Sequence, residues 1–91
     1  MTVVNNNGGG NQSKRGFDRV YGGQQTDKAR ELWTFSKLNF ARIAEDMGAL
    51  GIRVENAAAF PAALAQALAA NRPAIIDVVT DIEALAPTAV A

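Results

Sequence analysis

The sequence predicts an α/β fold: a two-layer or three-layer sandwich on a small parallel sheet, with three main strands and two crossover helices. Three short β-prone segments, 2–5, 52–54 and 74–79, alternate with segments of helical periodicity. Such alternation is typical of parallel sheets. Segment 74–79 is apolar almost throughout, which favours the sheet centre because a central strand is buried on both faces. We therefore expect the strand order 1-3-2.

The first strand, Thr2–Asn5, runs into three asparagines and three glycines at residues 5–10. Asparagine and glycine tolerate positive φ and end a strand abruptly. Ligands of open α/β sheets bind just past the carboxyl ends of strands. Amide and carbonyl oxygens suit a hard cation, and glycine N–H groups suit a phosphate. This segment therefore predicts a corner that binds a metal and a phosphate. The alternative is a capped turn without a ligand.

Residues 8–36 are mostly polar and rich in glycine at their start, and we expect a long loop here with a short helical turn near 27–33. Long loops of this kind are usually functional or disordered. Within it, residues 13–23 mix basic and aromatic side chains, a pattern that also occurs in proteins that bind single-stranded nucleic acid. A solvated loop is the simpler interpretation, because the formal net charge of the chain is zero.

The first helix with a clear sequence signal is expected to begin after Asn39, a good N-cap residue. Gly48 is placed to end it in a left-handed conformation. The short alternating strand 52–54 follows and suits a sheet edge. One apolar stripe at helical spacing supports the helix: Phe40, Ile43, Ala44 and Met47.

The second helix precedes the central strand. Pro61 must lie in its first turn, because an interior proline would remove a backbone hydrogen bond. Asn71 can end this helix, and we expect the alanine-rich tail, residues 85–91, to fray. The apolar stripe of the helix consists of Phe60, Leu64, Ala67 and Leu68.

Composition limits the classes of function. The 91 residues are 48% hydrophobic and carry no net charge, which disfavours a general nucleic-acid binder. Residues 1–30 hold a net +3 and the remainder −3, so the glycine-rich end is the one that favours anions. Without cysteine or histidine, zinc sites built on those ligands, disulfides and a Ser-His-Asp triad are excluded. No apolar run is long enough to span a membrane and no leader pattern is present, so we expect a cytoplasmic protein.

Three passages, in order, resemble the thiamine-diphosphate-dependent enzymes, a family that includes acetolactate synthase and benzoylformate decarboxylase. The run Val3-Val4-Asn5-Asn6 matches the strand and Asn-Asn pair that close the family's metal-binding motif. The next four residues, 7–10, are most similar to the thiamine-dependent synthase of menaquinone biosynthesis. Residues 39–54 resemble the family's helix-Gly-Ala-x-Gly-strand passage, and residues 72–81 resemble its last strand, which the family places between the two preceding ones. Residues 11–36 fit poorly.

The resemblance implies the C-terminal part of the diphosphate-binding domain of a 2-oxo-acid carboligase or decarboxylase, with thiamine diphosphate and Mg²⁺ as cofactors. It implies that the Asn6 side-chain oxygen and the Gly8 carbonyl ligate Mg²⁺, with Asn7 and Gly9 as alternates one residue along. It also implies that the amides of Gly8, Gly9 and Gly10 face the diphosphate. No residue is assigned a catalytic role, because the cofactor performs the chemistry in this family.

The opening Gly-Asp-Gly half of the family's motif is absent from the sequence. Its aspartate is a principal metal ligand in the family, and the activating glutamate comes from another domain. We therefore expect residues 1–91 to be a single partial domain, a C-terminal fragment or truncated relative that is inactive alone. Expected partners are the remainder of the enzyme or further copies of the chain. The alternative is a non-enzymatic α/β module for binding or assembly.

Acidic and aromatic residues outside the corner have simpler interpretations. Asp77 lies within the apolar strand, where a carboxylate that finds backbone donors has a structural role. Glu45 and Asp46 fit the solvated face of a helix. Trp33 and Phe35 are expected in a core or an interface.

Overall fold

The computed structural model describes residues 1–24 and 26–84, so the tail expected to fray, 85–91, lies outside the described residues. The chain divides into two compact units. The first, here called the sheet unit, comprises residues 1–6 and 37–80. The second, here called the loop unit, comprises residues 7–36 and 81–91.

The sheet unit is built on three parallel strands: β1 (Thr2–Asn6), β2 (Leu50–Val54) and β3 (Ala74–Val79). Their order is β1-β3-β2, which confirms the predicted order 1-3-2. The central strand is the most buried, as its apolar sequence predicts. Its Asp77 pairs in register with Val4 on one side and Arg53 on the other.

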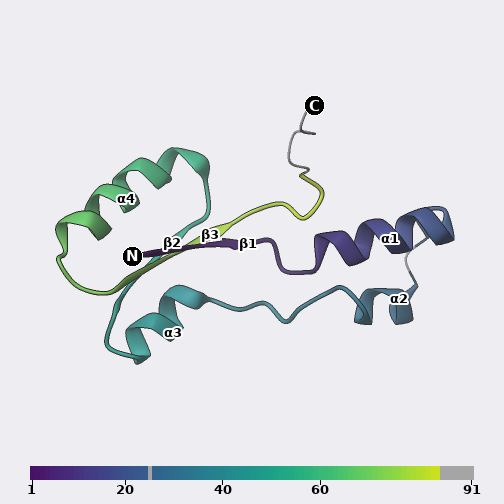
Figure 1. Cartoon of the computed structure of the whole chain (residues 1–91), viewed down its shortest axis with the longest axis horizontal. Helices are drawn as coiled ribbons and strands as arrows, with labels where there is room; N and C mark the ends of the chain where they lie inside the picture. The colour runs from purple at the N-terminus through teal and green to yellow at the C-terminus, as the bar shows by residue number, and fades with distance from the viewer. Residues whose placement is uncertain (25, 85–91) are drawn as a thin grey trace, which may run out of the picture. The chain divides into compact units, whose positions relative to one another are not determined.

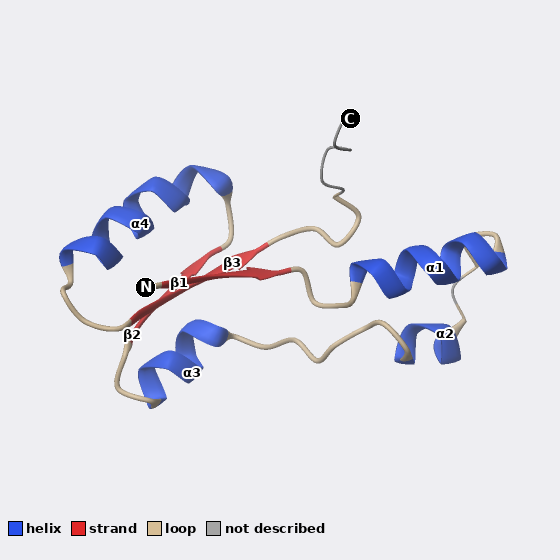
Figure 2. Ribbon diagram, in the orientation of Figure 1, coloured by secondary structure: helices blue, strands red, loops and turns tan. Residues whose placement is uncertain are grey.

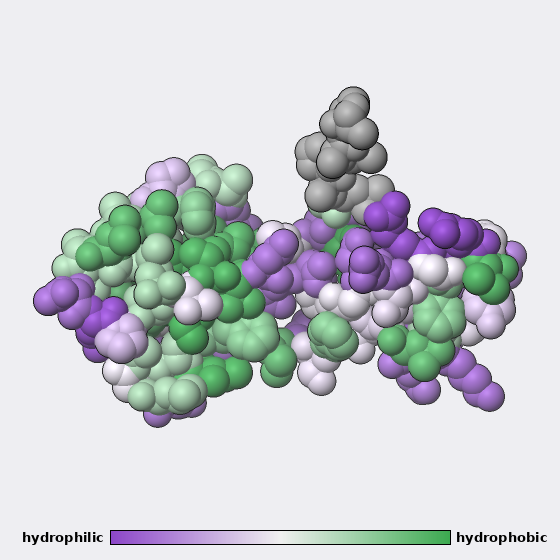
Figure 3. Space-filling view, viewed as in Figure 1, coloured by the Kyte–Doolittle hydropathy of each residue, from purple (hydrophilic) through white to green (hydrophobic). Residues whose placement is uncertain are grey.

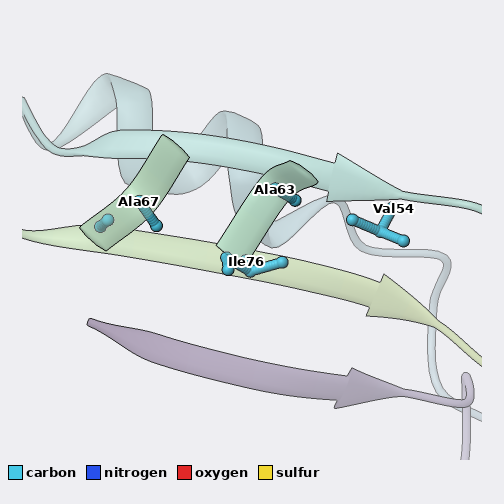
Figure 4. Packing of buried hydrophobic residues seen from close by; sticks show 5 residues of the cluster. Val54, Ala63, Ala67 and Ile76 are labelled. Atoms are coloured by element: carbon cyan, nitrogen blue, oxygen red, sulfur yellow. The ribbon is translucent and has the colours of Figure 1, made fainter. Parts of the chain in front are cut away.

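Two helices, α3 (Phe40–Asp46) and α4 (Phe60–Ala69), cover opposite faces of this sheet, so the sheet unit has three layers (Figures 1 and 2). A short 3₁₀ turn, η1 (Ala57–Ala59), leads into α4. The core lies under α4 and is modest because alanine supplies much of it (Figure 4). Its buried members are Val54, Ala63, Ala67, Ala74 and Ile76.

The ends of both helices form where the sequence predicts. Asn39 caps α3, since its side-chain oxygen accepts a hydrogen bond from Arg42 N at 3.1 Å. Gly48 follows this helix with a φ of 87°. Pro61 lies in the first turn of α4, and Asn71 follows that helix with a φ of 52°.

Gly51 allows α3 to pack directly on β2. A Cβ at this position would lie 1.9 Å from the carbonyl oxygen of Ala41, closer than any side chain could be. The resulting approach brings the first turn of α3 against the sheet, where the backbone N–H of Phe40 reaches the carboxylate of Asp77.

The loop unit differs from expectation. A long loop over 8–36 is wrong for its first part, because α1 (Asn11–Tyr21) is an eleven-residue helix. Lys14 and Asp18 form an i,i+4 ion pair at 2.6 Å, and the rings of Phe17 and Tyr21 stack 5.9 Å apart on the next turn. The many glycine and polar residues of this segment favour a loop, although the spacing of Phe17, Val20 and Tyr21 is helical.

The expected short helical turn near 27–33 is present as α2 (Asp27–Glu31). Thr26 caps it by accepting a hydrogen bond from Ala29 N at 3.1 Å. Ala29 is the buried residue of this helix, while Phe35 farther along is 60% exposed. Phe35 therefore does not enter a core in the described chain, and its expected alternative place, an interface, stays a prediction.

Hydrophobic side chains lie along α4 and its surroundings in the surface view (Figure 3). Leu68 of this helix is 66% exposed, and Val3 of the edge strand β1 is 46% exposed. None of the helices in the described residues is long and apolar enough to cross a bilayer.

Candidate functional site

Asn6 is the last residue of β1 and is partly buried. Its backbone carbonyl accepts a hydrogen bond from Thr80 N at 3.0 Å, which extends the sheet ladder to the strand end. Its side-chain Nδ2 donates to the carbonyl of Leu38 at 2.9 Å. Within the described residues its Oδ1 has no hydrogen-bond partner, so an unused amide oxygen stands at the carboxyl end of the strand.

The neighbouring asparagines use their side-chain oxygens. Asn5 Oδ1 accepts a hydrogen bond from the Thr80 hydroxyl. Asn7 Oδ1 accepts from the backbone N–H of Gly9 at 3.1 Å. Among the three asparagines, only the Asn6 oxygen is left open in the part of the chain that the structure describes.

The glycine run, residues 8–10, belongs to the loop unit. It is hydrogen-bonded to residues 33–35, a pairing that the sequence did not predict. Gly9 forms an antiparallel bridge with Thr34. The Gly8 carbonyl accepts from Phe35 N at 2.9 Å, and Gly10 N donates to the Trp33 carbonyl at 2.7 Å. A Cβ at Gly9 would lie 2.6 Å from that Trp33 oxygen, so glycine is required for this close pairing.

These contacts show which of the three glycine amides already have a hydrogen-bond acceptor. The amides of Gly9 and Gly10 are already donated, to Asn7 Oδ1 and to the Trp33 carbonyl. The amide of Gly8, which has a φ of 75°, has no acceptor among the described residues. One of the three predicted diphosphate-facing amides is therefore available without any rearrangement.

A charged network lies behind Asn6 in the sheet unit. Asp77 is fully buried, and its Oδ2 accepts hydrogen bonds from Phe40 N at 2.9 Å and from Arg53 Nη1 at 3.1 Å. The same Arg53 Nη1 lies 3.3 Å from the Leu38 carbonyl, which is also the acceptor of Asn6 Nδ2. The contacts of Asp77 agree with the expected structural role for this carboxylate.

Lys14 is the most heavily engaged cation of α1. Its Nζ lies 2.6 Å from Asp18, 2.8 Å from Glu83 and 5.6 Å from the centre of the Trp33 ring. Hydrogen bonds to Asp18 and then Glu83 raise the pKa of Lys14, against a smaller opposing effect of desolvation. One of the basic groups of segment 13–23 is thus already paired inside the loop unit.

Mg²⁺ takes oxygen ligands, and the two predicted ligand atoms, Asn6 Oδ1 and the Gly8 carbonyl oxygen, are of that type. The Gly8 carbonyl oxygen retains one lone pair beyond its hydrogen bond from Phe35. The described residues contain no group of three or more acidic or histidine side chains that could hold a metal. Each of these two atoms is therefore of a type that Mg²⁺ binds, and each is a neutral donor rather than a carboxylate.

The family model for the C-terminal TPP-binding domain of thiamine pyrophosphate enzymes matches residues 1–78. The chain belongs to this family. The match spans both units and nearly all of β3, and it confirms the resemblance to the thiamine-diphosphate-dependent enzymes as a family. Domains of this family bind thiamine diphosphate, usually with Mg²⁺. Searches of curated proteins and of solved structures found no match.

Proposed function

We propose that this thiamine pyrophosphate-binding domain contributes part of a Mg²⁺–diphosphate site to a 2-oxo-acid carboligase or decarboxylase. Asn6 Oδ1 and the Gly8 carbonyl oxygen serve as two of the magnesium ligands. This proposal rests on the open Oδ1 of Asn6, because the corresponding oxygens of Asn5 and Asn7 already accept hydrogen bonds. The same observation favours Asn6 over its alternate, Asn7.

The glycine run supplies the anion-binding part. The N–H of Gly8 donates to a diphosphate oxygen, as glycine amides in turns commonly do. The amides of Gly9 and Gly10 join it only by exchanging their present acceptors, Asn7 Oδ1 and the Trp33 carbonyl. When bound, thiamine diphosphate supplies the carbanion chemistry of the reaction. The residues of this chain bind and orient it.

Neutral donors alone hold magnesium weakly. Protein sites for Mg²⁺ usually combine one or two carboxylates with waters and substrate phosphates. In this proposal the negative charge comes from the diphosphate and from a carboxylate outside the ligand pair of Asn6 and Gly8. We expect the domain to act within a larger assembly that provides that carboxylate.

An apolar groove in the loop unit supports a second candidate, a non-enzymatic binding module. It lies between α1 and α2, and Phe17, Tyr21, Ala29 and Leu32 line it. A ligand of a non-enzymatic module would bind there rather than at the carboxyl end of β1.

Paramagnetic broadening by Mn²⁺, a magnesium substitute, tests the proposed site in the ¹⁵N-labelled chain with thiamine diphosphate present. We expect selective broadening of the backbone amides around Asn6 and Gly8. An Asn6→Leu substitution should abolish it, whereas Asn5→Leu should retain it because the Asn5 side chain pairs with Thr80 instead. Broadening that survives Asn6→Leu, or that centres on the groove between α1 and α2, would contradict the proposal.

A further inference from the structure

We propose that Arg53 and Asp77 are positioning residues that hold the side chain of Asn6 in its metal-accepting orientation, through the carbonyl of Leu38. The inference rests on the proposed function in taking Asn6 Oδ1 as a magnesium ligand. Every residue in the network belongs to the sheet unit.

The first step is the attachment of Arg53 to Asp77. Asp77 is 0% exposed, and its Oδ1 has no hydrogen-bond partner among the described residues. A buried carboxylate is costly without a compensating cation, so Asp77 holds the guanidinium of Arg53 beside its other oxygen. Glu55 fixes the guanidinium from a second direction, since its Oε1 lies 3.1 Å from Arg53 Nε.

The second step is the placement of the Leu38 carbonyl. Arg53 Nη1 lies 3.3 Å from this oxygen and 3.1 Å from Asp77 Oδ2, so one nitrogen joins the carbonyl to the buried carboxylate. Two residues later, Phe40 N donates to the same Asp77 oxygen. The segment that enters α3 is therefore attached to Asp77 twice, once directly and once through Arg53.

The third step is the orientation of the Asn6 amide. Its Nδ2 donates to the Leu38 carbonyl at 2.9 Å. An amide flipped by a half-turn would place Oδ1 against that carbonyl, where two acceptors repel and no hydrogen bond forms. The fixed carbonyl thus selects the orientation in which Nδ2 is used and Oδ1 is open. Groups behind a metal ligand commonly orient it in this way.

Loss of Arg53 removes one of the two attachments of the segment at Leu38 and leaves the Asn6 amide free to flip. We expect the affinity for Mn²⁺ with thiamine diphosphate to fall about tenfold, at the low end of the effect of such outer residues. We also expect a change that requires no metal, namely a loss of order in the Asn6 side-chain amide.

The experiment measures ¹⁵N relaxation of the Asn6 side-chain NH₂ group in the metal-free full chain, followed by an Mn²⁺ titration with thiamine diphosphate. The variant is Arg53→Gln, and the matched control is Arg42→Gln, which changes an exposed arginine of α3 in the same unit. The proposal predicts an ordered amide in the wild type and in Arg42→Gln, and a mobile one in Arg53→Gln. Asn6→Asp assigns the resonance by removing it.

Equal order of the Asn6 amide in wild type and Arg53→Gln would overturn the proposal. Should Arg53→Gln fail to fold, the double variant Arg53→Met/Asp77→Asn removes both charges and is judged by the same criterion. A mobile amide in the variant together with no Mn²⁺ broadening in the wild type would overturn the metal role of Asn6 and leave the orienting network intact. The two claims therefore fail separately.

Discussion

Arg53 and Asp77 face each other in register on the neighbouring strands β2 and β3, with Nη1 and Oδ2 3.1 Å apart. The side chain of Asp77 is fully buried and that of Arg53 is 30% exposed. The pair is therefore asymmetric: the cation can still reach water when its partner is removed, and the carboxylate cannot.

This asymmetry predicts unequal costs for removing the two partners. Arg53→Met leaves a buried charge uncompensated and should lower the free energy of unfolding by about 3 kcal/mol. Asp77→Asn should cost less, because the new amide oxygen can still accept the hydrogen bond from Phe40 N. Urea denaturation followed by circular dichroism gives both values. A larger loss for Asp77→Asn than for Arg53→Met would contradict this account of the pair.

Gly51→Ala should disrupt the contact between α3 and β2. The added Cβ would meet the Ala41 carbonyl oxygen at 1.9 Å, so the helix must shift, at a cost of about 3 kcal/mol or more. Gly48→Ala is the control for an added Cβ that meets no atom, because nothing lies within 4 Å of it, although the φ of 87° at this position is unusual for alanine. The control should cost about 1 kcal/mol from backbone strain alone. Equal losses in thermal denaturation would show that α3 adjusts without penalty.

Much of the sheet unit was predictable because its signals are local and agree with one another. Asn39, Gly48 and Pro61 mark helix ends whatever the tertiary context, and the apolar run of β3 requires a central position. In the loop unit the glycines suggested a loop, while the i,i+4 pair of Lys14 and Asp18 and the ring stack of the next turn favour a helix.

The candidate site was predictable only in part. The sequence placed Asn6 and Gly8 at the end of a strand, but it could not show which of three consecutive asparagines keeps an open oxygen. That depends on Leu38, Gly9 and Thr80, and both Leu38 and Thr80 are distant in the sequence. The pairing of Gly9 with Thr34 is likewise non-local, and no sequence pattern within 33–35 signals it.

The pKa of Lys14 predicts a dependence of stability on alkaline pH. Its partners raise the folded-state pKa above the unfolded value, so the lysine stabilises the folded state fully below the unfolded pKa, which is about 10.4. That contribution is lost as the pH rises through the folded pKa. The stability difference between wild type and Lys14→Gln should therefore be constant near neutral pH and shrink above about pH 10.

Fluorescence of Trp33, the sole tryptophan of the sequence, reports unfolding near Lys14, whose Nζ lies 5.6 Å from the ring centre. Lys28→Gln is the control, since it removes an exposed lysine of α2 in the same unit. Because Lys28 forms no ion pair within the described residues, this substitution should change the stability little. A Lys14→Gln difference that stays constant with rising pH would show that the ion pairs do not raise the pKa.

The chain should self-associate through β1. This strand pairs with β3 on one side, and its other edge has no partner strand within the described residues. Val3 is 46% exposed beside an apolar groove that Phe60 and Val78 help to line. Open edges with exposed β-branched residues recruit further strands. Sedimentation at tens of micromolar should therefore report a dimer or larger species.

A charge at the strand edge should oppose this association. Val3→Lys is expected to give a monomer, whereas Val20→Lys, at a 72% exposed position on α1, should sediment as the wild type does. A wild-type monomer at the same concentration would show that the β1 edge does not recruit a partner.

Titration of the ¹⁵N-labelled chain with thiamine diphosphate, with and without Mg²⁺, tests the central claim most directly. Because both proposed ligand atoms are neutral, we expect a dissociation constant for thiamine diphosphate above about 1 mM. This corresponds to less than about 4 kcal/mol of binding free energy. Shift changes should centre on the amides of Asn6 and Gly8 and should require Mg²⁺. Micromolar binding, or shifts confined to the groove of Phe17 and Tyr21 and independent of Mg²⁺, would contradict the claim that Asn6 and Gly8 hold the metal and diphosphate.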